Sequence, residues 1–356
     1  MDLLIYGSYG YTGDLIARQA AEAGATPTLA GRDRTEVQRQ AAELDLPFRV
    51  FDLDADDVAA HLEAADADAV LNCAGPFVET HRPMVDACVE TGTHYLDITG
   101  EIEVFESIAA RDEAAAEADV QLLPGVGFDV VPTDCLAAHL AERLPDATAL
   151  RLGFQAEGGI SPGTAATAVN SMGEGGAIRR DGRIKSVDAA YDTRHIDFGR
   201  GETGAISIPW GDVSTAYYTT GIGDITVYIA VPGVARLMMR SSDLFAPLFA
   251  LPGVTDTLQE LVRATVEGPD EATREHTNCY VWGEASNDEQ RVVSRLVTPN
   301  TYALTVDAAL LVARKVLDGE WEPGFGTPGG IYGPELVLEI DGVERTDEEP
   351  VRVVNR

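Results

Sequence analysis

Lysine is nearly absent from this 356-residue chain. Lys185 and Lys315 are the only lysines among 26 basic residues, and 59 acidic residues bring the net charge to −33. The acidic residues are dispersed rather than gathered in one block. Dispersed carboxylates keep a protein hydrated while high salt screens their repulsion, so the composition is typical of a halophilic protein. An ordinary acidic mesophilic enzyme is the alternative. The same charge repels phosphate backbones and makes nucleic acid an unfavourable partner.

Cysteine and long apolar runs are also scarce. Four cysteines, Cys73, Cys88, Cys135 and Cys279, are scattered without a Cys-x-x-Cys pair or a zinc-like spacing with histidine. We therefore expect reduced thiols and no metal site. No apolar run reaches the ~18 residues of a membrane-spanning helix, and the first residues lack the basic stretch of a signal peptide. These absences favour a cytoplasmic protein and disfavour a membrane partner.

Two catalytic motifs and one catalytic pair are missing. The sequence contains no His-Glu-x-x-His and no Gly-x-x-x-x-Gly-Lys-Ser/Thr, which excludes the zinc proteases and P-loop enzymes that carry them. No tyrosine is followed by a lysine four residues later, so the Tyr-x-x-x-Lys acid of short-chain dehydrogenases is absent. The apolar content of 45 % is nevertheless that of a folded chain, with a length that suits about two domains.

A glycine-rich turn stands at the start of the chain. A short apolar strand leads into Gly7-x-x-Gly10-x-x-Gly13, and an amphipathic helix follows from Asp14 to Ala23. The first glycine permits a tight turn, the second admits backbone N–H groups close to a pyrophosphate, and the third lets the helix pack on the strand. The alternative is a turn without a ligand. The predicted dinucleotide loop comprises Gly7, Ser8, Tyr9, Gly10, Tyr11, Thr12 and Gly13.

Strands and helices alternate over residues 1–124. Short apolar strands are separated by helices of ten or so residues, the last of which is expected over 104–119. This order predicts an α/β fold whose N-terminal NAD(P)-binding domain is a Rossmann-type, doubly wound parallel sheet.

Residues 125–300 have a different pattern. Longer, half-buried strands dominate, and one of them is expected over 214–219. The pattern predicts a second, α+β domain on a mixed or antiparallel sheet, used for substrate binding or oligomerisation. Its helices are expected near 133–143, 162–179 and 234–265.

Two further segments follow this second domain. A helix is expected over 302–318 and is predicted to return to the nucleotide domain. Residues 343–356 are polar and are expected to form a frayed tail.

The end of the second strand indicates which nicotinamide cofactor is bound. An NAD site usually carries an acid there, for the ribose 2′-hydroxyl. Here Gly31 leaves room and Arg32 offers a planar cation for a 2′-phosphate, so we predict NADP, with NAD as the alternative. Asp33 is expected to cap the next helix. After the third strand, Asp52 and Leu53 are predicted to lie near the adenine, unless Asp52 is only a turn residue.

The fourth strand ends in residues 72–77 (NCAGPF) at the carboxyl edge of the sheet, where open α/β sheets bind ligands. Ala74, Gly75 and Pro76 are expected beside the nicotinamide ribose, with Phe77 as an apolar wall. Cys73 is expected to be a packing residue rather than a nucleophile.

Polar residues gather around the end of the fifth strand. Hydride transfer to C=N, C=O or an activated C=C needs a proton donor nearby. For each candidate, a structural hydrogen bond is the alternative role, and Asp129 could instead cap a helix that starts near Pro132. The candidates are His94, Tyr95, Asp97, Glu101 and Asp129.

An ordered set of motifs resembles the saccharopine dehydrogenase-like oxidoreductase family, including its trans-acting enoyl reductase branch. The resemblance covers roughly residues 1–340 and implies a nicotinamide cofactor and an α/β second domain. The motifs are residues 7–13 (GSYGYTG), 31–33 (GRD), 72–77 (NCAGPF), 92–101 (GTHYLDITGE), 127–134 (GFDVVPTD), 268–274 (GPDEATR), 298–302 (TPNTY) and 327–333 (TPGGIYG).

The resemblance and the residues together predict an NADP(H)-dependent oxidoreductase acting on a small-molecule substrate, with hydride transfer to or from a C=N, C=O or activated C=C bond. The substrate is expected in the cleft between the nucleotide sheet and the second domain. A saccharopine site must bind several carboxylates, yet no obvious arginine cluster is present. Arg179, Arg180 and Arg183 come nearest, and they are expected on a surface turn.

The most apolar region is the stretch 234–251. We expect it in the core or in a homodimer interface. It also motivates the alternative function, a dinucleotide-binding protein without turnover that acts as a lipid-associated or scaffold protein.

Overall fold

The computed structural model describes residues 2–157, 175–231 and 270–352. The chain divides into two compact units. Unit 1 comprises Met1–Val131 with Leu304–Ile331, and unit 2 comprises Pro132–Ala303 with Tyr332–Arg356. Each unit is built around its own sheet.

Unit 1 contains a seven-stranded sheet whose strands all run parallel. The spatial order is β3-β2-β1-β4-β5-β6-β15. The order reverses between β1 and β4, and a reversal of this kind opens a crevice for ligands outside the carboxyl ends of the strands. The predicted Rossmann-type sheet is confirmed. Its strands are β1 (Leu3–Tyr6), β2 (Thr28–Gly31), β3 (Phe48–Val50), β4 (Ala69–Asn72), β5 (His94–Asp97), β6 (Gln121–Leu123) and β15 (Gly324–Phe325).

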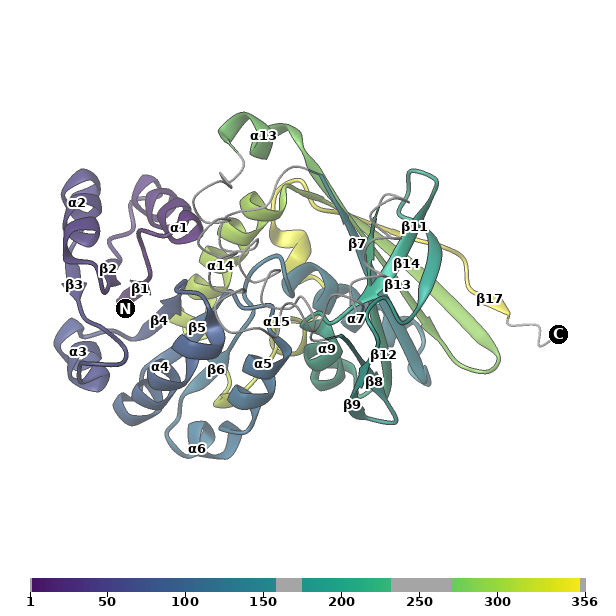
Figure 1. The fold of residues 1–356 in the computed structure, drawn as a ribbon, viewed down its shortest axis with the longest axis horizontal. Coiled ribbons are helices and arrows are strands. Elements are labelled where there is room, and N and C mark those ends of the chain that lie inside the picture. Colours follow the sequence, from purple (N-terminus) through teal and green to yellow (C-terminus); the bar gives the residue numbers. More distant parts are fainter. Residues whose placement is uncertain (1, 158–174, 232–269, 353–356) are drawn as a thin grey trace. The chain divides into compact units, whose positions relative to one another are not determined.

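The helices of unit 1 lie on both faces of this sheet. Figure 1 shows α1 and α2 on one side and α3 and α4 on the other. The strands between them are buried on both faces, as the apolar residues of β1 and of the first three positions of β4 require. The helices are α1 (Tyr11–Glu22), α2 (Arg34–Leu44), α3 (Val58–Ala65), α4 (Phe77–Thr91), α5 (Ile102–Ala109), α6 (Asp112–Glu117), α14 (Thr301–Leu317) and α15 (Pro328–Tyr332).

The end of the chain contributes to unit 1. Helix α14 belongs to this unit from Leu304 onward, and the Gln19 side chain of α1 donates a hydrogen bond to Asp307 of α14 at 2.5 Å. Strand β15 then pairs with β6, in register Phe325 with Leu122. Sequence patterns did not predict β15, because a two-residue strand has no periodicity to detect.

The expected single helix over 104–119 is wrong. Two helices, α5 and α6, replace it, because the backbone leaves helical geometry at Arg111, with φ −98° and ψ 2°. The alanine-rich composition gave no sign of this break.

Unit 2 contains a mixed sheet in the order β10-β11-β12-β7-β13-β14-β16. Strands β12 and β7 are parallel, and the other pairs are antiparallel. The predicted second α+β domain on a mixed sheet is confirmed as a fold class. The strands are β7 (Ala149–Ala156), β8 (Gly176–Arg180), β9 (Arg183–Val187), β10 (Thr193–Asp197), β11 (Glu202–Ile208), β12 (Asp224–Ala230), β13 (Asn278–Ser286), β14 (Gln290–Pro299), β16 (Glu344–Asp347) and β17 (Val351–Arg352).

Helix α7 (Val131–Arg143) packs on this sheet through a glycine. A Cβ atom at Gly283 would lie 2.5 Å from Leu140 Cδ1 and 3.1 Å from Leu136 Cδ2, so the missing side chain lets the helix approach β13. The remaining described helices of unit 2 are α9 (Asp212–Thr220), α13 (Glu271–His276) and the 3₁₀ helix η2 (Leu336–Glu339).

The strand expected over 214–219 is wrong, because these residues lie in α9. Threonine and tyrosine favour strands on propensity. Here the Thr219 and Thr220 hydroxyls instead donate back to the carbonyls of Thr215 and Ala216 within the helix, and Gly221 ends it with φ +71°. Burial of the first turn of α9 outweighs the strand propensity of these residues.

The frayed tail expected over 343–356 is also wrong for the residues up to 352. Strands β16 and β17 both pair with β14. Asp347 of β16 accepts hydrogen bonds from Ser294 at 2.7 Å and Arg143 at 3.3 Å, and contacts His139 Nε2 at 2.9 Å. A polar segment is held here by polar partners, which hydrophobicity patterns do not reveal.

Several expectations lie outside the described residues. These are the helix near 234–265, the apolar stretch 234–251 and most of the helix near 162–179. The last residues of that third segment, 176–179, form strand β8 rather than helix. No helix in the described ranges is long and apolar enough to cross a membrane.

Arginines cluster in unit 2 where the sequence showed no cluster. Glu284 of β13 is buried, and its carboxylate lies 3.1 Å from Arg151, 3.2 Å from Arg194 and 3.5 Å from Arg291. The three arginines are far apart in sequence and meet through strand pairing. Arg179, expected on a surface turn, is buried and donates to the carbonyl of Val213 at 2.8 Å.

Candidate functional site

The glycine loop lies where β1 meets β4. Gly7 has φ +76°, and a Cβ atom there would lie 2.8 Å from the backbone N of Ala74. A Cβ at Gly13 would lie 2.3 Å from the carbonyl oxygen of Gly7. Neither position has room for any side chain. The loop is therefore pressed against the β4 loop on one side and the first turn of α1 on the other, at the switch point of the sheet.

The start of α1 offers donors to an anion. Gly10 is the N-cap residue, and no side chain caps the helix. The Ser8 hydroxyl is buried and has no hydrogen-bond partner among the described residues. A buried hydroxyl without a partner costs free energy unless a ligand or water satisfies it. Together with the close glycine packing, this loop fits the pyrophosphate of a dinucleotide.

A buried glutamine holds the loop in place. Gln40 of α2 donates to the carbonyl of Ser8 at 2.7 Å and to the carboxylate of Asp14 at 2.8 Å. Sequence reasoning missed Gln40. The available signal was a polar residue on the buried face of α2, where Val37 and Ala41 are its buried neighbours.

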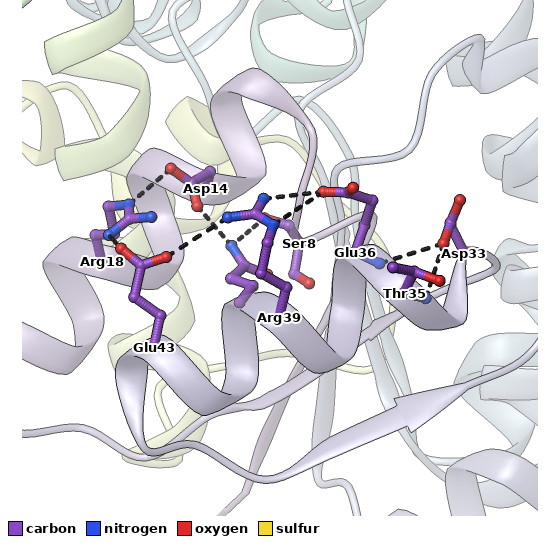
Figure 2. Close-up of polar contacts among 9 residues, drawn as sticks. Ser8, Asp14, Arg18, Asp33, Thr35, Glu36, Arg39 and Glu43 are labelled. Atoms are coloured by element: carbon purple, nitrogen blue, oxygen red, sulfur yellow. Dashed lines mark hydrogen bonds and ion pairs between the residues drawn. The ribbon is translucent and has the colours of Figure 1, made fainter.

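Charged residues extend this contact between α1 and α2, as Figure 2 shows. Arg18 bridges Asp14 at 2.7 Å and Glu43 at 2.8 Å. Arg39 joins Glu43 at 3.6 Å and Glu36 at 2.9 Å. The pairs are partly exposed and each contributes little to stability. As a chain, they connect the glycine loop with the start of α2.

The turn after β2 carries the predicted cation. Arg32 is exposed and makes no hydrogen bond or ion pair with any described residue. Asp33 caps α2, as expected, by accepting from the backbone N–H groups of Thr35 and Glu36. Arg34, the first residue of α2, is likewise exposed and without a partner in the described ranges. Sequence reasoning did not single out Arg34.

The room expected above Gly31 is filled. A Cβ atom at Gly31 would lie 2.5 Å from Cε1 of Tyr9, so the tyrosine ring rests directly on the glycine. The Tyr9 hydroxyl also accepts a hydrogen bond from the backbone N–H of Asp33 at 3.2 Å. Gly31 thus serves a contact inside the protein, and the space over the glycine is not open to a 2′-phosphate.

Asp52 and Leu53 follow β3. The Asp52 carboxylate accepts from the backbone N–H of Asp54 at 3.0 Å, as a turn residue does. Leu53 is buried in the core of unit 1, in the same cluster as Phe51. This placement favours the turn role of Asp52, and contact of either residue with adenine stays a prediction.

The β4 loop is held by Asn72, at the end of the strand. The buried Asn72 side chain accepts from the N–H of Ala74 at 3.0 Å, and the Thr80 hydroxyl donates to the Ala74 carbonyl at 2.6 Å. Gly75 is exposed, Pro76 is the N-cap of α4, and Phe77 packs partly against the core. The loop is ordered beside Gly7, as a nicotinamide-ribose contact requires. Cys73 is half-buried, and burial raises the pKa of its thiol, which disfavours a nucleophile.

The Asp97 carboxylate accepts hydrogen bonds from two loops and from Tyr95. Its carboxylate is fully buried and accepts from the N–H groups of Thr99 at 3.0 Å and Gly125 at 2.8 Å, and from the Tyr95 hydroxyl at 2.8 Å. Burial raises the pKa of Asp97 to about 6, against the lowering effect of these donors. Asp97 and Tyr95 thereby join the loops after β5 and β6.

His94 lies at the opposite edge of the sheet. It is the first residue of β5, in register with Ala69 at the start of β4. Its ring contacts that of Trp321 with centroids 4.3 Å apart, and its Nδ1 accepts from the N–H of Gln121 at 3.1 Å. Burial lowers the pKa of His94. The geometry corrects the expectation that it lies at a strand end near the cofactor.

Glu101 and Asp129 are brought together at the carboxyl edge. A Cβ atom at Gly100 would lie 2.7 Å from Asp129 Oδ2, so the glycine makes room for that carboxylate next to Glu101. Glu101 accepts from the N–H of Val78 at 3.0 Å, at the start of α4. Burial raises the pKa of each group to about 7, and the Glu101 charge adds to the rise at Asp129. Two carboxyl groups poised near neutrality can hold and release a proton.

Unit 1 matches a known domain family. Residues 3–123 match the family model described as the saccharopine dehydrogenase NADP binding domain. The match runs from β1 to β6 and includes the glycine loop and the ends of β2, β4 and β5. The predicted resemblance to saccharopine dehydrogenase-like oxidoreductases is confirmed, and the match supports NADP as the cofactor.

Two curated relatives resemble the chain over a limited length. A trans-acting enoyl reductase of Mycobacterium leprae is 33 % identical over 151 residues, which is 40 % of this chain and 36 % of the relative. A human saccharopine dehydrogenase-like oxidoreductase is 30 % identical over 151 residues, 37 % of this chain and 35 % of the relative. The chain therefore matches about a third of the length of these relatives.

Two solved structures share the fold. Apo saccharopine dehydrogenase (L-Glu forming) from Saccharomyces cerevisiae has a TM-score of 0.66 at 13 % identity, covering 98 % of this chain and 100 % of the other. Homospermidine synthase from Legionella pneumophila, in complex with NAD, has a TM-score of 0.59 at 10 % identity, covering 95 % of this chain and 88 % of the other. The first confirms the predicted fold class, and the second shares the same fold.

The raised pKa of Glu101 predicts a pH-dependent stability. Its folded-state pKa lies above the unfolded value, so its protonated form favours folding, and that stability is lost as pH rises through about 7. Between pH 5 and pH 8 the natural protein should lose about 2 kcal/mol more of its free energy of unfolding than Glu101→Gln does. Urea unfolding at fixed high KCl measures this.

Glu90→Gln is the matched control, because Glu90 is exposed on α4. It should behave as the natural protein does. Equal pH dependence in Glu101→Gln and Glu90→Gln would show that Glu101 ionises normally in the folded state.

Proposed function

We propose that the chain is an NADP(H)-dependent oxidoreductase of the saccharopine dehydrogenase-like type. It transfers a hydride between nicotinamide and a C=N, C=O or activated C=C bond of a small-molecule substrate. The observation that carries the proposal is the glycine loop at the switch point of a seven-stranded parallel sheet, within the segment that matches an NADP-binding domain.

In this proposal, three groups of residues contact three parts of the cofactor. The loop over 7–13 and the start of α1 hold the pyrophosphate, the turn at Arg32 holds the 2′-phosphate, and the loop over 74–77 lies along the nicotinamide ribose. The bound nicotinamide supplies the hydride chemistry. The protein orients it and excludes water from its surroundings.

Proton transfer falls to Glu101 and Asp129 in this proposal. They lie at the carboxyl edge of the sheet, on the same side as the glycine loop, and Gly100 allows their close approach. With both pKa values raised to about 7, one of the two carboxyl groups carries a proton near neutral pH. Asp97 and Tyr95 act through the loops they hold and do not donate to the substrate.

Replacing Arg32 tests the cofactor assignment. Arg32→Ala removes an unpaired guanidinium from the predicted 2′-phosphate contact, so the Kd for NADPH should rise about tenfold or more, while the Kd for NADH changes little. Titration followed by nicotinamide fluorescence measures both. Equal losses for both cofactors would defeat the assignment.

Arg49 offers a matched arginine that is not part of this contact. It lies in β3 and donates to the carbonyl of Ala64. Arg49→Ala should leave the preference for NADPH over NADH unchanged. Absence of any binding by the natural protein would remove the oxidoreductase proposal itself.

A substrate panel tests the chemistry. Cyclic imines, imino acids, ketones and enoyl thioesters would each be offered with NADPH, and oxidation of the cofactor followed at 340 nm. For a substrate that turns over, Asp129→Asn should lower kcat about a hundredfold and remove the acidic or basic limb of the pH profile near 7. An unaltered profile would assign the proton to another group.

We also propose that the protein works in a cytoplasm of high salt, and the charge of the chain supports this. A net charge of −33 destabilises a compact chain in dilute buffer, and the screening length falls from about 10 Å at 0.1 M salt to about 3 Å at 1 M. The thermal unfolding midpoint should therefore rise by several degrees, on the order of 10 °C, between 0.1 and 2 M KCl.

Sucrose at equal osmolality is the control, because it strengthens burial without screening charge. A rise with sucrose as large as that with KCl would mean that charge screening is not the cause. No change with KCl would indicate an ordinary acidic enzyme.

A further inference from the structure

Tyr9 connects two parts of the nucleotide site. Its backbone lies in the glycine loop, between Ser8 and Gly10, while its ring rests on Gly31 at the end of β2. Its hydroxyl accepts the backbone N–H of Asp33 at 3.2 Å. One side chain therefore spans from the pyrophosphate loop to the turn that carries the predicted 2′-phosphate contact.

The Tyr9 hydroxyl does not donate a hydrogen bond to any described residue. A phenol has one O–H donor and accepts through its lone pairs. The only hydrogen bond of this hydroxyl to described residues is the one it accepts from Asp33. The ring is half-buried, and its contact with Gly31 fixes the direction in which the hydroxyl lies. A donor at a fixed position is what a phosphate oxygen can use.

The two neighbours of Asp33 supply positive charge at the same turn. Arg32 and Arg34 flank it in sequence, both are exposed, and neither pairs with any described residue. Two cations at one turn, neither with a partner among the described residues, suit an anion from outside the protein. The hydroxyl of Tyr9 reaches the backbone of this same turn.

We propose that Tyr9 determines the preference for NADP(H), by donating its hydroxyl proton to the ribose 2′-phosphate beside Arg32 and Arg34. The inference rests on the proposed function and goes beyond it, since it assigns a glycine-loop residue to the ribose end of the cofactor. Because Tyr9 belongs to the loop, occupancy of the 2′-phosphate contact also steadies the pyrophosphate loop. NADH carries a 2′-hydroxyl in place of the phosphate, so Arg32 and Arg34 add nothing to its affinity.

Tyr9→Phe is the direct test. It removes one oxygen and keeps the ring on Gly31, so folding is retained, and the thermal unfolding midpoint checks this. A hydrogen bond to a charged group is worth about a tenfold change in affinity. The Kd for NADPH should therefore rise about tenfold and the Kd for NADH should change by less than about twofold.

The fragments 2′-phospho-ADP-ribose and ADP-ribose, used as competitors, separate the ribose phosphate from the nicotinamide. Tyr9→Phe should weaken the binding of 2′-phospho-ADP-ribose as much as it weakens that of NADPH. It should leave the affinity for ADP-ribose unchanged. Tyr191→Phe is the control, because Tyr191 is 55 % exposed in unit 2. It should leave both fragments unchanged.

Tyr9→Ala distinguishes a ligand from an obstacle. If the ring only blocks the space over Gly31, its removal should tighten NADPH binding, and that result would overturn the inference. An unchanged NADPH preference in Tyr9→Phe would overturn it too. Failure of the proposed function looks different, since the natural protein would then bind neither NADPH nor NADH, whatever residue stands at position 9.

Discussion

The nucleotide-binding unit depends on a backbone contact between β1 and β4. Gly7 lies against Ala74 so closely that no side chain fits between them, and Gly13 lies closer still to the carbonyl of Gly7. The positive φ of Gly7 turns the chain, and the lack of side chains lets α1 start directly above the switch point of the sheet. Ser8, Tyr9 and the β4 loop owe their positions to this contact. A side chain at either glycine would move all of them together.

Around this contact, buried polar groups hold loops in place. Asp97 joins the loops after β5 and β6 through Thr99 and Gly125, and Asn72 shapes the β4 loop. Each satisfies its neighbours' backbone N–H groups, so replacing it would leave buried donors without partners. Burial raises the pKa of all three carboxyl groups, to about 6 at Asp97 and to about 7 at Glu101 and Asp129. Asp97 is held by donors from two loops, while Glu101 and Asp129 are brought together at the carboxyl edge.

The sequence predicted the elements whose signals are local. Glycine spacing gave the loop at 7–13, and alternating apolar strands and helices gave the parallel sheet. It failed where position depends on distant residues. His94 lies away from the carboxyl edge because it is the first residue of the four-residue strand β5, whose two ends lie at opposite edges. Tyr9 on Gly31 and the meeting of Arg151, Arg194 and Arg291 at Glu284 required the folded chain. Residues 214–219 read as a strand because their threonines and tyrosines favour one.

The way β15 and α14 complete unit 1 bears on how the chain is made. Unit 1 begins at the N-terminus but takes its seventh strand from residues 324–325 and a helix that packs against α1 from residues after 304. During synthesis, residues 1–131 leave the ribosome before β15 and α14 exist. More than 170 further residues are added before the first of these elements is made. During that interval, β6 pairs with β5 but has no partner on its other side, and such an unpaired edge is where misfolded pairings begin. A strand of two residues therefore matters more to the newly made chain than its length suggests.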